Sequence, residues 1–389
     1  MGKPAASKDP LLLSDDAALE AFVGDLQEQD RVAFDTEAAS YHRYVDRIYL
    51  IQISSESSTA LVDPLAVSNL KPVGRLLSDA DVEVVFHDAD YDLRVLDRDY
   101  GFRAKRLFDT RITAQLLGEP SVGLGPLLEK YFGVKVNKKM QRADWSRRPL
   151  TAEMISYAAS DTAYLLALRD ELRGRLDKEG RLAWAEEEFK RLESIRWTSN
   201  GANGQAFLRI KTAKTLPPKS LAVLKAVHAW REEKAASLDR APFRVLGNEA
   251  LVALARSAPT TMRRLRSVSG VPTASARRYG DELIQAVQEG LDTPAEKYPK
   301  VERHRRPKVS RTAQHRVERL KALRKRAAAN LGIEVGVLCP NGTLQAIAIA
   351  APTDAKELKK IPEVKRWQCE ALGPSAVLEA VNGVGGSKK

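Results

Sequence analysis

Two acidic residues stand two positions apart near the start of the chain, directly after an apolar run. Asp35 and Glu37 follow residues 31–34 in the sequence RVAFDTE, and residues 31–35 predict a strand. Residues i and i+2 of a strand point to the same face, so the two carboxylates would lie side by side. They would repel each other unless a proton or a cation lay between them, and oxygen ligands suit Mg²⁺ or Mn²⁺. The pair alone is open to two interpretations, a metal site or a solvated strand end.

A phenol and a carboxylate form a second pair of interest. Tyr157 and Asp161 lie four positions apart in SYAASDTAYLL, within a helical pattern predicted over 152–172. Residues i and i+4 of a helix share a face, so the two groups would stand one turn apart. The same spacing also suits a tyrosine that packs on the core and bonds a neighbour through its hydroxyl.

A third candidate follows the apolar run VEVVF. Asp92 opens the helical pattern DLRVL, so it would be fixed at a junction between a strand and a helix. Asp88 and Asp90 lie in the same segment, HDADYD, and compete with it as loop or capping residues. Sequence spacing alone does not choose among the three.

The elements that must position these residues are strands first and helices after them. This order indicates an α/β domain over about the first 200 residues. Strands are predicted at 31–35, 48–53, 60–62 and 82–86, and helices at 92–96, 111–117, 122–132 and 152–172, the last ending at Arg173-Gly174.

The remaining sequence is helical and contains a weak repeat. Gly-rich residues 199–207 and Pro- and Arg-rich residues 294–310 predict linkers on either side of a helical stretch over 216–290. Residues 224–255 are similar to 320–348, which indicates two copies of one small module; chance similarity is the alternative. The matched pairs are Leu224 with Leu320 and, after a gap of three, Val245 with Leu338, Asn248 with Asn341 and Leu251 with Leu344.

Charge is divided unevenly along the chain. Residues 1–200 hold 28 Lys and Arg against 34 Asp and Glu, a net charge of −6, and residues 201–389 hold 35 against 17, a net charge of +18. An acidic half suits metal binding and a basic half suits a polyanion such as nucleic acid. The alternative is a soluble basic surface that binds nothing.

Several classes of protein are disfavoured. No apolar run approaches the roughly 18 residues needed to cross a bilayer, and the N-terminal residues show no secretory signal. Cys339 and Cys369 are the only cysteines, and the five histidines form no zinc-like cluster. We expect a cytoplasmic protein with no disulfide framework and no membrane association. The oligomeric state is not readable from the sequence.

Three ordered motifs resemble those of the ribonuclease D family, a branch of the proofreading-type 3′→5′ exonucleases. They are DTE at 35–37, HDADYDLRVL at 87–96 and YAASD at 157–161, and the similarity extends over about 12–195. Segments between them agree as well: LIQIS at 50–54, VDPL at 62–65, FDTRITAQLLG at 108–118 and KKMQRADWSRRPL at 138–150. Residues 216–292 resemble an HRDC domain, and 312–384 resemble a divergent second copy.

The resemblance implies a fold and an activity. The expected fold is an α/β ribonuclease H-like catalytic domain followed by one or two small all-α HRDC domains, with limits at 1–200, 214–293 and 310–385. The expected activity is hydrolysis of RNA from a free 3′-hydroxyl end to nucleoside 5′-monophosphates, in the 3′ maturation of transfer RNA or other stable RNA. A DNA exonuclease and a non-catalytic RNA-binding protein are the alternatives.

The resemblance also implies roles for single residues. The residues that match the family's metal-binding carboxylates, for two divalent ions (Mg²⁺ or Mn²⁺), are Asp35, Glu37, Asp92 and Asp161. Tyr157 matches the motif's tyrosine and would orient the attacking water, because a phenol with a pKa near 10 is a poor base. A nearby basic segment would hold RNA phosphates or form a solvated loop, through Lys138, Arg142, Arg147 and Arg148.

We predict that Asp35→Asn or Asp161→Asn lowers the rate of RNA hydrolysis by several orders of magnitude. RNA binding should survive, because the basic half of the chain carries most of it. Turnover in Mg²⁺ and RNA affinity, measured on the same purified variant, test this. Near-normal turnover of Asp35→Asn would contradict the metal assignment.

Overall fold

A six-stranded mixed sheet forms the centre of the N-terminal domain (residues 9–198). The strand order is β1-β4-β3-β2-β5-β6, with β2–β3 and β3–β4 antiparallel and the other neighbours parallel. The strands are β1 (Leu11–Leu13), β2 (Arg31–Ala38), β3 (Ile48–Ser54), β4 (Thr59–Val62), β5 (Glu83–Phe86) and β6 (Leu107–Asp109). The computed structural model describes residues 9–136, 138–198, 205–301 and 310–383.

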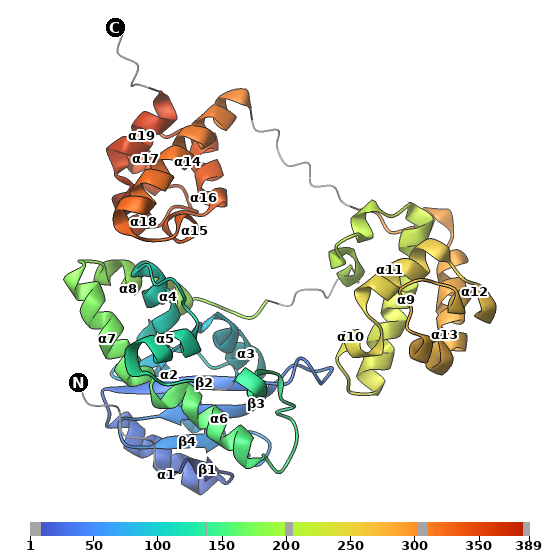
Figure 1. The fold of residues 1–389 in the computed structure, drawn as a ribbon, viewed down its shortest axis with the longest axis horizontal. Coiled ribbons are helices and arrows are strands. Elements are labelled where there is room, and N and C mark those ends of the chain that lie inside the picture. Colours follow the sequence, from blue (N-terminus) through green and yellow to red (C-terminus); the bar gives the residue numbers. More distant parts are fainter. Residues whose placement is uncertain (1–8, 137, 199–204, 302–309, 384–389) are drawn as a thin grey trace.

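Helices cover this sheet (Figure 1). Every residue of β3, β4 and β5 is buried, as expected for strands with both faces covered. The helices are α1 (Asp16–Gln27), α2 (Lys71–Ser78), α3 (Asp90–Tyr100), α4 (Thr110–Leu116), α5 (Leu124–Phe132), η1 (Lys138–Arg142), α6 (Ala152–Ala163), α7 (Leu165–Lys178) and α8 (Leu182–Leu192). The expected α/β fold class is confirmed.

Two features of the sequence-based prediction are wrong in detail. Strands β1 and β6 were not predicted, because three residues are too few to show a period. The helix predicted over 152–172 is two helices that meet at Tyr164, and the second does not stop at Gly174. Leu176 extends its buried stripe, and it ends at Lys178, just before Gly180 adopts a left-handed conformation (φ +65°).

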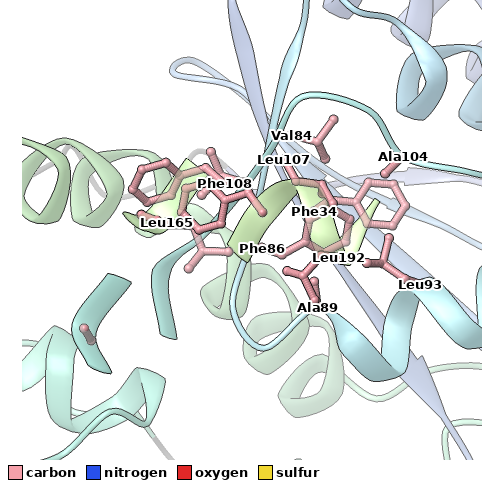
Figure 2. Packing of buried hydrophobic residues seen from close by; sticks show 14 of the residues in the cluster. Phe34, Val84, Phe86, Ala89, Leu93, Ala104, Leu107, Phe108, Leu165 and Leu192 are labelled. Atoms are coloured by element: carbon pink, nitrogen blue, oxygen red, sulfur yellow. The ribbon is translucent and has the colours of Figure 1, made fainter. Parts of the chain in front are cut away.

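One apolar core holds β2 and α3, which carry three of the candidate carboxylates, and α7, which follows the fourth. Helix α6 itself packs through Met154 and Ala158 into a second, smaller cluster. Figure 2 shows Phe34, Phe86 and Phe108 packed among Leu93 and Leu165. The rings of Phe34 and Phe86 lie 5.3 Å apart, and Phe34 is fully buried. Phe34 adjoins Asp35, Leu93 adjoins Asp92, and Leu165 begins the helix after Asp161. Core packing therefore fixes how these three chain segments lie relative to one another.

Two helical modules follow the N-terminal domain. The first module (205–301) contains η2 (Ala206–Arg209), η3 (Ala213–Thr215), α9 (Pro218–Ser237), α10 (Pro242–Val245), α11 (Asn248–Ser257), α12 (Met262–Arg266), α13 (Thr273–Leu291) and η4 (Ala295–Lys297). The second module (310–383) contains α14 (Arg311–Leu331), α15 (Val335–Leu338), α16 (Asn341–Ala350), α17 (Ala355–Lys359), α18 (Arg366–Leu372) and α19 (Pro374–Asn382). Residues 199–204 of the first predicted linker and 302–309 of the second lie outside the described residues. Within the described ranges, no helix is long and apolar enough to cross a membrane.

The two modules repeat at a constant spacing. α11 begins at Asn248 and α16 at Asn341, 93 residues later, and the same offset separates the starts of α9 and α14, α10 and α15, and α12 and α17. A buried arginine recurs at this spacing: Arg231 donates to the Leu246 carbonyl (3.3 Å), and Arg324 donates to the Cys339 carbonyl (2.5 Å). The structure therefore supports a duplicated module.

The constant spacing corrects one matched pair of the sequence repeat. An offset of 93 places Val227, not Leu224, opposite Leu320. The three-residue gap introduced in the sequence alignment does not exist. It arose because helix-rich sequence matches itself at several registers.

The second module is docked on the N-terminal domain, where α18 lies beside α8 (Figure 1). The Trp184 and Trp367 rings stack with centroids 5.2 Å apart. Lys365 Nζ lies 2.6 Å from both carboxylate oxygens of Glu188, which also accepts from Trp367 Nε1 (2.5 Å). Buried apolar side chains form one continuous cluster through both parts. We therefore expect them to unfold together.

We predict that Trp367→Ala destabilises the N-terminal domain and the second module together, by about 3–5 kcal/mol, because it removes a buried aromatic ring. Chemical denaturation should show one shifted transition. Ile349→Ala is the control, because Ile349 is 55% exposed and its loss should cost less than about 0.5 kcal/mol. Separate transitions for the N-terminal domain and the second module in the wild type would contradict a shared core, whereas the first module has a core of its own.

Candidate active site

Asp35 and Glu37 lie on one face of β2, near its end. In the antiparallel pair with β3, Asp35 lies opposite Gln52 and Glu37 opposite Leu50. The pairing becomes irregular between Glu37 and Ala38, which ends the regular ladder just after the two acids. The strand therefore presents both carboxylates together, as their spacing predicted.

Asp92 lies in the first turn of α3, and it is held in place from two sides. Thr36 Oγ1 donates to Asp92 Oδ1 (2.5 Å), which ties the helix to β2 between the two acids of that strand. The junction before α3 is fixed by Asp109, which accepts from the Ala89 N–H (2.8 Å) and caps α4. Asp92 is 6% exposed, so it is largely shielded from water.

Asp161 reaches the same region from α6, which packs against β2, β3 and β4. Its neighbour Thr162 is fully buried and bonds Ser54 on β3 through the two hydroxyls (2.7 Å). The Tyr157 hydroxyl donates to the Asp161 carboxylate, as expected for residues one helical turn apart. Helix α6 thus supplies both a carboxylate and a phenol.

The four carboxylates interact strongly with one another. Burial, and then the charge of Asp161, raise the pKa of Asp35 to about 8. Burial raises the pKa of Asp161 to about 7. The pKa values of Glu37 and Asp92 are raised well above the ordinary range, by burial first and by the neighbouring carboxylates second. Without a counter-charge the cluster would hold protons at neutral pH.

The chemistry of this donor set fits divalent cations. Hard oxygen ligands from several elements converge, and a cation would offset the burial and repulsion that raise their pKa values. Within the described residues, no group of three or more His, Cys, Asp or Glu side chains forms a ready-made metal cage. Mg²⁺ commonly binds one or two carboxylates and keeps water or substrate phosphates as its other ligands, so a full cage is not required.

Tyr157 is arranged as a hydrogen-bond donor. Burial, followed by the charges of Asp161 and Glu37, raises the pKa of Tyr157 above its ordinary value. Its ring lies 6.1 Å from that of Trp145, which is buried as a packing residue. A phenol that stays protonated can orient a water but cannot take its proton, which agrees with the role expected from the sequence.

The basic residues of the neighbouring segment differ in their surroundings. Arg142 and Arg147 are exposed, although Arg147 Nε lies 3.5 Å from Asp144. Arg148 is committed to the fold, because it bonds both carboxylate oxygens of Asp63 (2.5 and 2.7 Å) and the carbonyls of Tyr49 and Trp145. The assignment of Arg148 to phosphate binding is therefore corrected. The side chain of Lys138 lies outside the described part of the structure.

Two residues near the carboxylates were missed by the sequence analysis. Thr36 stands between Asp35 and Glu37 and bonds Asp92. Gln52 is fully buried opposite Asp35, and neither atom of its amide has a hydrogen-bond partner within the described residues. A lone polar residue in the apolar run IYLIQI was the available signal for Gln52. No local feature of the sequence indicated that Thr36 would contact Asp92.

Family models match most of the chain. A model described as a 3′-5′ exonuclease matches residues 11–177. A model of the HRDC domain matches twice, at 220–287 and 313–381, on the two helical modules. The expected helical domains are thus found in both positions.

Full-length relatives and solved structures agree with these matches. The chain is 34% identical over 287 residues to ribonuclease D of Shewanella sp. (strain ANA-3), which covers 73% of this chain and 74% of the relative. It is 30% identical to ribonuclease D of Nitrobacter hamburgensis over 94% of both chains. Its fold matches Escherichia coli RNase D, described as an exoribonuclease involved in structured RNA processing, with TM-score 0.71, 25% identity and coverage of 97% and 100%.

We predict that Tyr157→Phe lowers the hydrolysis rate by roughly 10²–10⁴, because it removes the hydroxyl that would position water. The ring and its contact with Trp145 remain, so the melting temperature should change little. Single-turnover rates and thermal melts measure the two effects. An unchanged rate, or a collapse in stability, would mean that Tyr157 serves packing instead.

We also predict that the metal-free protein loses stability as pH rises from about 4 to about 8. The folded state keeps protons on Asp35 and Asp161 that the unfolded chain releases near the ordinary value of 3.8, so raising pH favours unfolding. Mg²⁺ or Mn²⁺ should raise Tm most at the upper end of this range.

Asp161→Asn should raise the metal-free Tm near pH 8 and reduce the rise produced by metal. Asp25→Asn is the matched control, because Asp25 is exposed on α1, a helix that carries none of the four carboxylates. Thermal melts with and without metal, across pH, measure both effects. An equal metal response in wild type and Asp161→Asn would exclude Asp161 as a ligand.

Proposed function

Because this chain belongs to the ribonuclease D family and is a 3′→5′ exoribonuclease, we propose that it trims structured stable RNA, such as transfer RNA precursors, from the free 3′-hydroxyl end. The observation that carries this proposal is the clustering of Asp35, Glu37 and Asp92 with the Tyr157–Asp161 pair on β2, α3 and α6. The two free, buried cysteines suit work in the reducing cytoplasm.

The four carboxylates are proposed as the ligands of two divalent ions, Mg²⁺ or Mn²⁺. When bound, these ions would neutralise charge on the attacking and leaving oxygens and make a water nucleophilic. The carboxylates sit on elements anchored in two apolar clusters, with β2 and α3 in the larger one and α6 in the smaller one. Thr36 fixes the carboxylate of Asp92, and Tyr157 orients the water by donating its hydroxyl proton.

A hollow beside Tyr157 suits the end of an RNA strand. It has a volume of about 510 Å³ and is lined by Val134, Val136, Met140, Ser156 and Tyr157 among others. Apolar and hydroxyl side chains offer a surface for a base and a ribose, and Lys135 and Glu153 also line the hollow. A strand that ends in this hollow would place its last phosphodiester near Asp161, which accounts for attack at an end of the strand.

The basic helical modules are proposed to hold the body of the RNA. The catalytic half has a net charge of −6 and does not attract a polyanion by itself, whereas residues 201–389 have a net charge of +18. HRDC modules that bind RNA phosphates would compensate for the negative charge of the catalytic half.

We predict that RNA labelled at its 5′ end shortens stepwise and releases nucleoside 5′-monophosphates. A 3′-phosphate should block the reaction, because it replaces the terminal hydroxyl that must enter the site. The products are resolved by gel electrophoresis and chromatography of the released nucleotides.

A circular RNA is the control for direction, and a DNA strand of the same sequence is the control for sugar preference. Internal cleavage of the circle would contradict the exonuclease activity. Faster digestion of DNA than of RNA would contradict the proposed substrate. A transfer RNA precursor left untrimmed beyond its mature end would contradict the maturation role.

A further inference from the structure

A basic depression lies on the first helical module, where α10 meets the start of α13. Its volume is about 410 Å³, and its lining includes four arginines, Arg240, Arg244, Arg277 and Arg278, together with Tyr279. All four arginine side chains are exposed. Four guanidinium groups around one hollow form a concentrated positive surface on this module.

These arginines lack acidic partners in the part of the chain that the structure describes. No salt bridge joins any of the four to a carboxylate among those residues, and the nearby Asp239 pairs instead with Arg43 (3.1 Å). Arg244 donates to the Tyr41 carbonyl (2.7 Å), a neutral acceptor. The mutual repulsion of the four groups is therefore not offset by nearby carboxylates, and a bound anion would offset it.

The second module shows that the module fold does not require these charges. At an offset of 93, the positions of Arg240, Arg244, Arg277 and Arg278 are occupied by Ile333, Val337, Glu370 and Ala371. The correspondence extends to the backbone, because Asp239 (φ +44°) and Gly332 (φ +67°) both adopt positive φ values. The equivalent surfaces of the two modules therefore carry different side chains.

In the second module this surface is a docking face. Ile333 is buried, and Trp367, which corresponds to the exposed Ala274, stacks on Trp184 of the N-terminal domain. Val337 lines a hollow shared with Ile112 and Leu116 of α4. One copy of the surface is therefore covered by apolar contacts within the chain, whereas the other is charged and, apart from its contact with the loop around Tyr41, open.

The basic depression is connected to the strand that carries two candidate carboxylates. The loop after β2 meets the first module where the Ala241 N–H donates to the His42 carbonyl (3.2 Å). On this loop, the Tyr41 ring lies between the guanidinium groups of Arg244 (4.7 Å) and Arg142 (5.6 Å). Positive charge thus extends from the first module, past Tyr41, to the segment beside the active site.

Aromatic side chains accompany this charge. Tyr41 and Phe243 are 41% and 47% exposed, and their rings lie 5.0 Å apart. Arginines for phosphates and exposed rings for bases are the combination that binds single-stranded nucleic acid. An acidic protein partner would complement the positive charge, but it would not need exposed aromatic rings beside the arginines.

We propose that Arg240, Arg244, Arg277 and Arg278 bind the phosphates of single-stranded RNA and guide its 3′ end along Tyr41 to the carboxylates. This rests on the proposed function, and it assigns the gripping role to one face of the first module. The equivalent face of the second module serves docking instead.

The test compares two double variants of the full-length protein. Arg277→Ala/Arg278→Ala removes two arginines from the depression, and Arg263→Ala/Arg264→Ala removes two exposed arginines from α12 of the same module. Both variants lose the same charge, and alanine suits a helix, so both should fold. The probe is a fluorescent single-stranded RNA long enough to reach from the first module to the active site, with binding measured in a chelator to prevent hydrolysis.

Arg277→Ala/Arg278→Ala should bind this RNA roughly tenfold more weakly or worse, and the slope of log affinity against log salt should fall by about 0.7 for each lost phosphate contact. The α12 control should match the wild type in affinity, slope and trimming rate. Equal losses in both variants would mean diffuse charge attraction and overturn the proposal. Unchanged binding by Arg277→Ala/Arg278→Ala would also overturn it, as expected if the face binds a protein.

Trimming by the wild-type protein separates this inference from the proposed function. If the wild type digests RNA from its 3′ end while both double variants bind it equally well, only the RNA-guiding role fails. If the wild type does not digest RNA, the proposed function itself fails, whatever the binding results.

Discussion

Mutual repulsion among four shielded carboxylates is the constraint on which the catalytic domain depends. Burial raises the pKa values of Asp35, Glu37, Asp92 and Asp161, and neighbouring carboxylates raise the first three further, so the metal-free arrangement opposes folding at neutral pH. The apolar core beneath them must supply the compensating free energy. Phe34, Leu93 and Leu165 lie in that core, each next to or near a carboxylate in the chain. The same repulsion would favour divalent cations at the proposed metal site.

The duplicated helical module illustrates how one surface can acquire two uses. Both copies keep a buried arginine that donates to an equivalent carbonyl, from Arg231 in the first and Arg324 in the second. They differ on the face where the helix after the long first helix meets the start of α13 in the first copy and of α18 in the second. There the second copy presents Trp367 to α8, and the first presents arginines to solvent. Apolar burial suits a permanent intramolecular contact, whereas unpaired guanidinium groups suit a polyanion that must be bound and released.

The contact between the first module and the N-terminal domain differs from the apolar docking of the second module. It is small and mostly polar, formed by Arg43 with Asp239 and by the loop around Tyr41. That loop follows β2 directly, so RNA bound on the module would lie against the same chain segment that continues into Asp35 and Glu37. Polar contacts of this kind are typical of interfaces between domains, whereas the second module is docked through an apolar core.

Local periodicity in the sequence determined which residues share a face. The i, i+2 spacing of Asp35 and Glu37 and the i, i+4 spacing of Tyr157 and Asp161 were predicted from the chain alone, as were four of the six strands and the two helical modules. Tertiary structure decided what lies far apart in sequence. The order of the strands brings β2, α3 and α6 together, Thr36 bonds Asp92 across 56 positions, and Arg148 is taken up by Asp63 across 85. The lack of acidic partners for the arginines around Tyr279 could not be predicted from the sequence either. It depends on which carboxylates lie nearby in space, and the order of residues along the chain does not give this.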